Sequence, residues 1–251
     1  MGRVRSLEGA AQFVGDVGIA AMWGKADLVL PSLWDAIAGP GADWAVRDDQ
    51  GKPTGFTPEF DRLWRWKDEL PERRLACAGK HFANAAVLIA PRLLAAAWTL
   101  AKPRRAEEPS PLERDVMQLV DEHGPLAAPE LRELLGTSDK KGVDKAITTL
   151  QRRLVLTNAG VFRQDAGWPA IQHDLFERRW RKWLRRKPTD EEASRELARA
   201  VLGAAKEVSA ADVAGALGWR RTQAAAVLDE LAEAGEARRV DDPDFALWRL
   251  S

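Results

Sequence analysis

The sequence is poor in cysteine and histidine and contains no tyrosine. Its 251 residues include one cysteine, Cys77, which excludes an internal disulfide and suits a reducing compartment. The three histidines, His81, His123 and His173, lie far apart in the chain and accompany no cysteine cluster. We therefore expect neither a metal nor a cofactor. The chain contains eleven tryptophans and no tyrosine, and the sequence alone assigns no role to this bias.

Long apolar runs are missing as well. The longest candidate, Ala83 to Leu100, is interrupted by Pro91 and Arg92 and falls short of the roughly 18 apolar residues of a membrane span. The first residues, Met-Gly-Arg-Val-Arg, lack the apolar block of a signal peptide. These absences predict a cytoplasmic protein without a membrane partner.

A formal net charge of zero conceals a strong segregation of charge. Residues 1–108 contain 15 basic residues (Lys and Arg) and 14 acidic residues (Asp and Glu), and residues 109–139 contain 2 basic and 7 acidic residues. Residues 140–187 contain 13 basic and 4 acidic residues, and residues 188–251 contain 8 basic and 13 acidic residues. An excess of nine positive charges (13 minus 4) in one stretch is typical of a surface that binds a polyanion. A solvated helix face is the alternative, and the placement of the basic residues decides between the two.

Two polar stretches that contain proline, residues 101–109 and 185–188, divide the chain into blocks. They predict three domains, over residues 1–102, 109–187 and 188–251. The first would be a winged-helix-like domain with an insertion at Trp44 to Gly55. Its predicted helices cover Leu7 to Met22, Leu33 to Ala38, Pro58 to Leu70 and Pro91 to Leu100, and its predicted strands cover Leu75 to Gly79 and Asn84 to Ile89.

The middle block predicts three helices and a hairpin. The capping box Ser110-Pro-Leu-Glu113 starts a helix that stops at Gly124, a second helix covers residues 129–135, and a third runs from Lys140 to Arg153. Two short strands, 154–157 and 161–164, are expected around a turn at Asn158–Gly160. This order is that of the winged helix-turn-helix, in which the third helix enters the major groove and the hairpin is the wing.

Basic side chains lie on the free face of that third helix. Its apolar residues Val143, Ile147 and Leu150 fall on one helical face, whereas Lys141, Lys145 and Arg152 fall opposite. The C-terminal block repeats the plan with helices over residues 189–205, 209–217 and 222–234, and with a second wing made of residues 238–240, a turn at 241–244 and residues 245–250. Because this copy is acidic, we expect it to contact a protein partner or to pack structurally.

Three phrases resemble a group of bacterial proteins described as AlkZ-related. They are Phe13-Val-Gly-Asp-Val-Gly-Ile19, Leu30-Pro-Ser-Leu-Trp34 and Trp64-Arg-Trp-Lys-Asp-Glu-Leu-Pro71. These proteins are relatives of the AlkZ DNA glycosylases, which unhook interstrand crosslinks and remove alkylated bases. The resemblance covers most of the chain and implies tandem winged helices that cradle duplex DNA, and a role in DNA repair.

The chain departs from the glycosylases at the motif that implies catalysis. Those enzymes use Gln-x-Gln or Gln-x-Asp in the N-terminal region to position the attacking water, whereas this chain has Ile-Ala-Ala-Met-Trp after Gly18. A Gln-x-Asp occurs only at Gln172-His-Asp174, which the prediction places between the middle hairpin and the following basic segment. We therefore assign no catalytic residue.

The basic segment Leu175 to Lys187 is expected to form a helix. Phe176, Trp180 and Trp183 fall on one of its faces, and arginines and lysines cover the rest. Three interpretations remain open: a clamp on the DNA backbone, a helix on a membrane surface, or a connector that docks its tryptophans on the core.

The sequence thus predicts a mainly α protein with small β wings, built of tandem winged helix-turn-helix domains. We expect a nucleoid-associated protein that binds double-stranded or branched DNA, with no demonstrated catalytic centre. A divergent glycosylase, a transcriptional regulator and a protein-interaction module stay open as alternatives. The candidate DNA-binding residues are Lys140, Lys141, Lys145, Thr148, Arg152, Arg153, Arg163, Arg178, Arg181, Lys182, Arg185, Arg186, Arg220 and Arg221.

Overall fold

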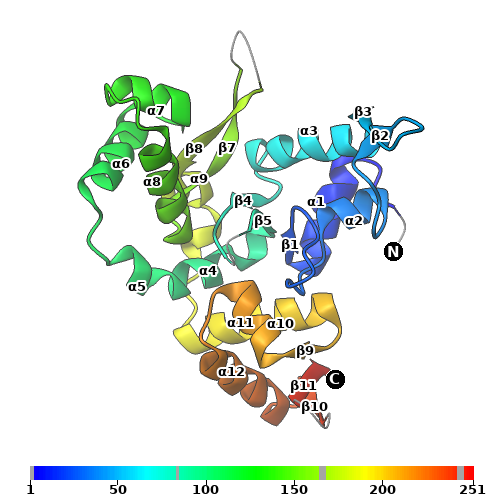
Figure 1. Ribbon diagram of the computed structural model, residues 1–251. Helices are drawn as coiled ribbons and strands as arrows, with labels where there is room; N and C mark the ends of the chain where they lie inside the picture. The colour runs from blue at the N-terminus through cyan, green and yellow to red at the C-terminus, as the bar shows by residue number, and fades with distance from the viewer. Residues whose placement is uncertain (1–2, 83–84, 164–167, 242–245) are drawn as a thin grey trace.

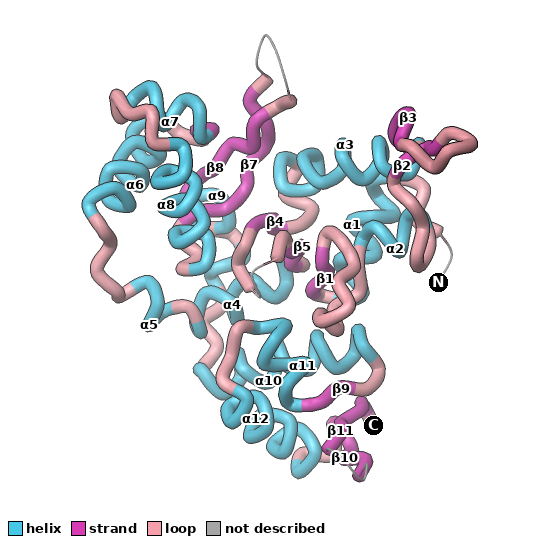
Figure 2. Tube along the Cα trace, viewed as in Figure 1, coloured by secondary structure: helices cyan, strands magenta, loops and turns pink. Residues whose placement is uncertain are grey.

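The computed structural model describes residues 3–82, 85–163, 168–241 and 246–251 (Figure 1). About half of the chain is helical, and the strands form small antiparallel sheets (Figure 2). Three units follow one another, each with the order helix, strand, helix, helix, strand, strand. In each unit, the last strand lies in the middle of a three-stranded sheet.

The first unit carries an additional hairpin between its second and third helices. The unit consists of α1 (Leu7–Val17), β1 (Ile19–Ala21), α2 (Leu33–Ala38), β2 (Ala45–Arg47), β3 (Pro53–Phe56), α3 (Pro58–Glu72), β4 (Cys77–Gly79) and β5 (Val87–Ile89). The predicted end of the first helix, at Met22, is wrong: Gly18 adopts a φ of 81° and ends α1, and the following residues form β1. Of the predicted strand 84–89, Asn84 lies outside the described residues.

A short 3₁₀ turn, η1 (Pro91–Leu93), leads from the first unit into α4 (Leu94–Leu100) and α5 (Lys102–Arg105). The stretch predicted as a linker therefore contains a helix. Arg105 ties this helix to α4, because its guanidinium lies 3.5 Å from the ring centre of Trp98 and donates to the carbonyl of Trp98 over 2.7 Å.

The middle unit contains the three predicted helices but a longer hairpin. Its elements are α6 (Pro111–His123), β6 (Leu126–Ala127), α7 (Ala128–Leu134), α8 (Lys140–Arg152), β7 (Leu156–Phe162) and β8 (Ala170–Leu175). The turn predicted at Asn158–Gly160 is wrong, because these residues form an irregularity inside β7, where the pairing with β8 shifts by one residue. Val161 and Phe162, predicted in the second strand, therefore belong to β7, and Gln164 of that predicted strand lies outside the described residues.

The third unit follows the sequence prediction closely. It consists of α10 (Asp190–Ala205), β9 (Val208–Ser209), α11 (Ala210–Leu217), α12 (Arg221–Glu233), β10 (Ala237–Asp241) and β11 (Ala246–Leu250). Thr189 and Glu192 form the capping box of α10, and Gly218 ends α11 in the left-handed conformation at φ 68°. Most of the expected turn, Asp242–Asp244, and Phe245 lie outside the described residues.

The predicted continuous basic helix is wrong. Residues 175–187 form a short helix, α9 (Phe176–Trp180), and after a turn a 3₁₀ segment, η2 (Trp183–Arg185). Phe176 and Trp180 are fully buried and Leu184 is 5% exposed, so these apolar side chains anchor the segment in the core. The docking of its aromatic residues on the core agrees with the connector interpretation.

One apolar cluster joins the first and third units. It combines Ile89 and Leu93 with Leu197 and Val201 of α10, and Phe176 and Trp180 belong to it. The middle unit has its own cluster around Val116, Leu131 and Leu150. Within the described residues, none of the helices is both long enough and apolar enough to cross a bilayer.

Truncation of Trp180 tests the anchoring role of the segment. We expect Trp180→Ala to lower the free energy of unfolding by about 3–5 kcal/mol, because the buried ring leaves a cavity. Trp183→Ala, at a half-buried position in the same segment, is the matched control with a smaller loss. Urea unfolding followed by circular dichroism measures both, and equal losses would contradict the assignment.

Candidate nucleic-acid interface

Helix α8 presents the clearest basic surface. Asp139 caps it by accepting a hydrogen bond from the amide of Gly142 over 2.9 Å. Val143, Ala146, Ile147 and Leu150 turn into the core, which leaves the opposite face to solvent. That face carries the exposed side chains of Lys140, Lys141, Lys145 and Arg152 and the half-exposed Thr148. In the part of the chain that the structure describes, the three lysines make no ion pair.

Three of the other predicted binding residues are engaged in ion pairs within the protein. Arg153 lies 3.4 Å from Glu113 and 3.2 Å from Glu107. Arg178 lies 2.6 Å from Asp174 and also reaches Asp121 over 3.4 Å. Arg186 pairs with Glu196 of α10. These three arginines therefore stabilise contacts between elements of the fold.

The remaining predicted residues are exposed but dispersed. Arg163 follows the end of β7, whereas Arg181, Lys182 and Arg185 lie in the segment of α9 and η2. Arg220 and Arg221 lie at the start of α12. Helix α12 lies in the lower part of the view in Figure 1, whereas α8 lies in the upper left part. The structure therefore brings together the five residues of α8 and does not join them to the basic residues of the third unit.

A cavity of about 350 Å³ lies beside α8, where the middle unit meets the first. Asp144, Thr148 and Gln151 line it from α8, and Ala170, Ile171 and His173 line it from β8. Lys80, from the loop between β4 and β5, contributes from the first unit. This cavity thus adjoins the basic face of the helix.

Gln151 holds this junction together through both ends of its amide. Its Oε1 accepts from the backbone amide of Lys80 over 2.9 Å. Its Nε2 donates to Asn158 Oδ1 over 2.7 Å and lies 3.2 Å from His173 Nδ1. Gln151 is 4% exposed, so these bonds satisfy a buried polar group. The sequence signal was a glutamine next to the apolar stripe of α8, which our prediction did not use.

His81 and Cys77 extend the buried network into the first unit. His81 Nδ1 donates to the carbonyl of Gln151 over 2.9 Å, which leaves Nε2 to accept from the Cys77 thiol at 3.4 Å. Burial raises the pKa of Cys77 to about 12, so the thiol stays protonated at neutral pH. A Cβ atom at Gly79 would lie 2.6 Å from His81 Nε2, so this close approach requires glycine. The network is structural in character.

The pKa values of the two buried histidines couple this junction to pH. Burial lowers the pKa of both His81 and His173 to about 4, below the value of about 6.5 in an unfolded chain. Between these two values the unfolded chain binds more protons than the folded protein, so stability falls as the pH falls. Asp68, whose pKa burial raises, acts in the opposite direction, because its folded form binds a proton more readily than the unfolded chain does.

We predict a loss of about 2 kcal/mol of stability per buried histidine between pH 7 and pH 5. Urea unfolding at both pH values measures it. His173→Gln should remove about half of the pH dependence, because it replaces one of the two buried histidines. Equal stability of the wild-type protein at the two pH values would contradict the prediction.

The Gln-x-Asp motif lies in a different place from the one predicted. Gln172 and Asp174 belong to β8, the second strand of the hairpin, and not to a connection after it. Asp174 Oδ1 accepts from the amide of Leu175 over 2.7 Å and from two nitrogens of Arg178, at 2.9 and 2.6 Å. Gln172 Nε2 donates to the carbonyl of Pro125 over 3.3 Å. Both side chains are thus used by the fold.

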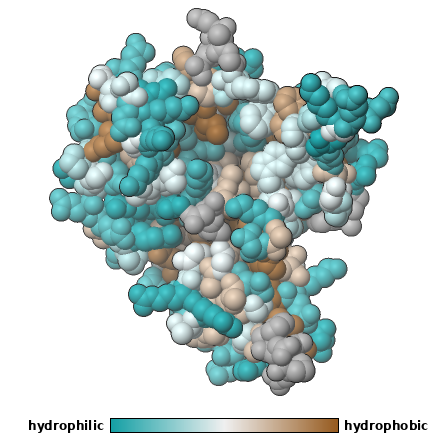
Figure 3. Space-filling model, in the orientation of Figure 1, coloured by the Kyte–Doolittle hydropathy of each residue, from teal (hydrophilic) through white to brown (hydrophobic). Residues whose placement is uncertain are grey.

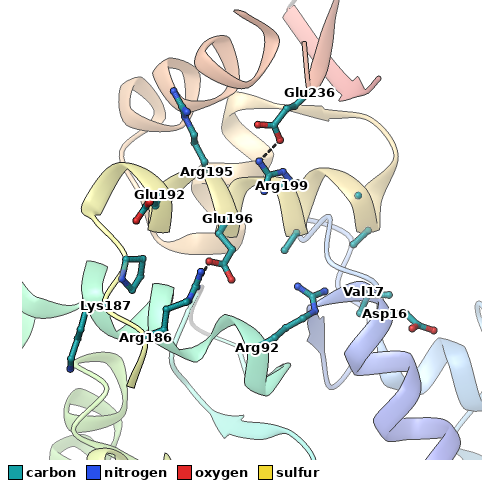
Figure 4. A pocket seen from close by; sticks show the side chains of 14 residues that line it. Asp16, Val17, Arg92, Arg186, Lys187, Glu192, Arg195, Glu196, Arg199 and Glu236 are labelled. Carbon is teal, nitrogen blue, oxygen red and sulfur yellow. Dashed lines mark hydrogen bonds and ion pairs between the residues drawn. The ribbon is translucent and has the colours of Figure 1, made fainter. Parts of the chain in front are cut away.

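A second, larger cleft lies between the first unit and α10 (Figure 4). It measures about 770 Å³ and contains Arg92, Arg186, Arg195 and Arg199. Carboxylates of the same cleft neutralise two of these cations: Arg186 pairs with Glu196, and Arg199 pairs with Glu236 (Figure 4). Arg195 pairs with Glu191 and Glu230. Because three of its four arginines are paired with carboxylates of the protein, this cleft is a weaker candidate for a polyanion than the face of α8.

Comparisons with known proteins agree with the fold. The family model described as AlkZ related matches residues 4–218. The solved structure of the DNA glycosylase AlkZ from Streptomyces sahachiroi is similar at 13% identity and a TM-score of 0.55, over 96% of this chain and 64% of that chain. This chain thus spans slightly less than two thirds of the length of that enzyme. No curated protein matches the chain.

A further solved structure shares little with the chain. It is the DIP2311 protein from Corynebacterium diphtheriae, at 16% identity over 77% of this chain and 39% of that chain. Its TM-score is 0.24, and we draw nothing from it.

Proposed function

The chain belongs to the AlkZ-related family, and from this membership we propose that it binds duplex or branched DNA in DNA repair. The observation that carries the proposal is the free face of α8, on which three lysines without ion pairs among the described residues stand beside Thr148 and Arg152. Phosphate contacts from such a face give affinity without reading sequence.

The three units are proposed to be winged helices. In support, each unit has the same element order and the same strand order, with the hairpin after the third helix. In a winged helix the third helix and the hairpin both face DNA. In the middle unit these elements are α8 and the hairpin β7–β8, and Arg163 at the end of β7 would extend the basic face.

We assign no catalytic reaction to the protein. Asp174 lies in the chain's Gln-x-Asp motif, but its Oδ1 accepts hydrogen bonds from Arg178 and a backbone amide, so this atom is engaged in the fold. Release of an alkylated base from a lesion duplex under excess protein would contradict a purely binding role and would favour the divergent glycosylase.

Salt dependence tests the proposal directly. Five cations, Lys140, Lys141, Lys145, Arg152 and Arg163, predict a slope of about −4 to −5 for log K against log salt on a plain duplex. Fluorescence anisotropy with a labelled duplex from about 0.05 to 0.3 M salt measures the slope. A protein that does not bind even at the lowest salt concentration would overturn the proposal.

Charge reversal tests the choice of face. The triple variant Lys141→Glu, Lys145→Glu, Arg152→Glu should weaken duplex binding at least about 100-fold at 0.1 M salt and flatten the slope by about 3. The fold should survive, because all three side chains are exposed.

Arg220→Glu with Arg221→Glu is the matched control in the third unit. It reverses exposed charges at the start of a third helix of the same plan, so it separates a local effect from net charge. If the control weakened binding as strongly as the variant of α8, the third unit would share the DNA surface and our choice of face would be wrong.

A further inference from the structure

Exposed apolar side chains gather at one place on the molecule. Among the described residues, four of the six large apolar side chains that are exposed lie together: Trp44 at 41%, Val46 at 48%, Phe56 at 42% and Trp168 at 59%. The first three belong to the β2–β3 hairpin or its edge, and Trp168 lies just before β8. We call Trp44, Phe56, Phe60, Trp64 and Trp168 the aromatic patch.

The rings of the aromatic patch form an ordered stack. Phe56 and Phe60 lie parallel with centres 4.4 Å apart, and Phe60 and Trp64 lie parallel at 5.5 Å. Trp168 meets this row edge-on, 6.1 Å from Phe56 and 5.4 Å from Trp64. Phe60 is only 9% exposed, but the other four rings are exposed or half-buried. Four such rings in one place mark a binding surface, because leaving them in water is unfavourable.

The charges around the aromatic patch are largely neutralised. Lys67 lies 4.3 Å from the ring centre of Trp64, yet it is paired with Asp68 over 2.6 Å. Arg62 pairs with Glu59 over 2.7 Å, and Arg47 pairs with Asp43. The cations that could bind a phosphate group here are therefore already paired with carboxylates, whereas the aromatic rings can stack with another flat, uncharged ring. Nucleobases are flat, uncharged rings of this kind.

Strand β8 leads from the aromatic patch to the cavity beside α8. Ala170 and Ile171 of β8 line the cavity beside α8, and Trp168 precedes them by two and three residues, a distance of about 7–10 Å along an extended chain. Figure 3 shows apolar and weakly polar residues beside the grey segment at the top, between the hydrophilic middle unit and the hairpin β2–β3. The aromatic patch and the basic helix thus lie on either side of β8 and its cavity.

The β2–β3 hairpin has no counterpart in the other two units. There the second helix leads directly to the third, from Leu134 to Lys140 and from Leu217 to Arg221. In the first unit this connection is extended by a hairpin whose strand β3 is exposed throughout, and it supplies Phe56 to the stack. The addition therefore builds a surface that the shared plan does not need.

We propose that the aromatic patch stacks the unpaired bases of DNA, so that the protein prefers a duplex containing a bubble or a single-stranded branch to a continuous duplex. The inference rests on the proposed function for the phosphate contacts of α8. It adds the class of DNA that the protein selects.

The test compares two labelled duplexes of the same length, one continuous and one with a central bubble of about six unpaired bases. Wild-type protein should bind the bubble about tenfold more tightly, within the range that stacking on an aromatic ring provides. Trp168→Ala and Phe56→Ala should bring the ratio of the two dissociation constants close to one and leave binding to the continuous duplex unchanged.

Two controls accompany these variants. Trp168→Phe keeps a ring and should keep most of the preference. Leu134→Ala removes an apolar side chain that is 48% exposed on α7, outside the aromatic patch, and should have no effect. Circular dichroism and urea unfolding confirm that each variant folds.

The outcomes separate this inference from the proposed function. Binding to both duplexes without a preference for the bubble overturns the inference and leaves the proposed function standing. No binding to either duplex overturns both. If sedimentation shows that Trp168→Ala converts an associated protein to a monomer and the preference for the bubble is unchanged, the patch is an interface between copies and the inference is wrong.

Discussion

The packing of Phe176 and Trp180 into the core fixes how the units meet. Both side chains are fully buried, and Phe176 stacks on Trp98 of α4 with ring centres 5.4 Å apart. His81, on the loop between β4 and β5, meets Phe176 edge-on at 5.7 Å. The chain leaves the middle unit at this point, so the same contacts that end β8 also set the position of α10. Every surface built from more than one unit depends on them.

Buried polar groups refine what this apolar contact positions. Arg179 is 8% exposed and donates to the carbonyls of Glu72 and Ala159, each over 3.0 Å, which ties α3 to β7. Gln151 ties α8 to the loop of the first unit. Hydrogen bonds of this kind are costly to leave unmade in a dry interior, so they allow few relative positions of the two units. The basic helix, the cavity and the hairpin are thereby held beside one another.

Charge is used in two different ways along the basic stretch. Arg153, Arg178 and Arg186 neutralise carboxylates and join elements of the fold, whereas the lysines of α8 stay in water without ion pairs among the described residues. A count of charge along the sequence adds both groups together. The positive charge that is available to a polyanion is therefore smaller than the count suggests, and it is concentrated on one helix.

Local signals in the sequence determined the helices and much of the surface chemistry of this protein. The capping boxes at Ser110 and Thr189 start helices where expected, and the stripe of Val143, Ile147 and Leu150 orients α8 with its lysines outward. Such signals act within one or two turns of chain, so they can be read without the fold. The family resemblance, which rests on short motifs, is also confirmed.

Tertiary structure decided the features that depend on residues far apart in the sequence. Asn158–Gly160 has the composition of a turn, but these residues belong to β7 because Asn158 and Gly160 pair with β8. The segment 175–187 has the composition of a basic helix, but burial of Phe176 and Trp180 anchors it and a turn interrupts it after α9. The aromatic patch joins Phe56 to Trp168 across more than 100 residues of sequence. No local pattern records such contacts, because their energy arises only when the units pack together.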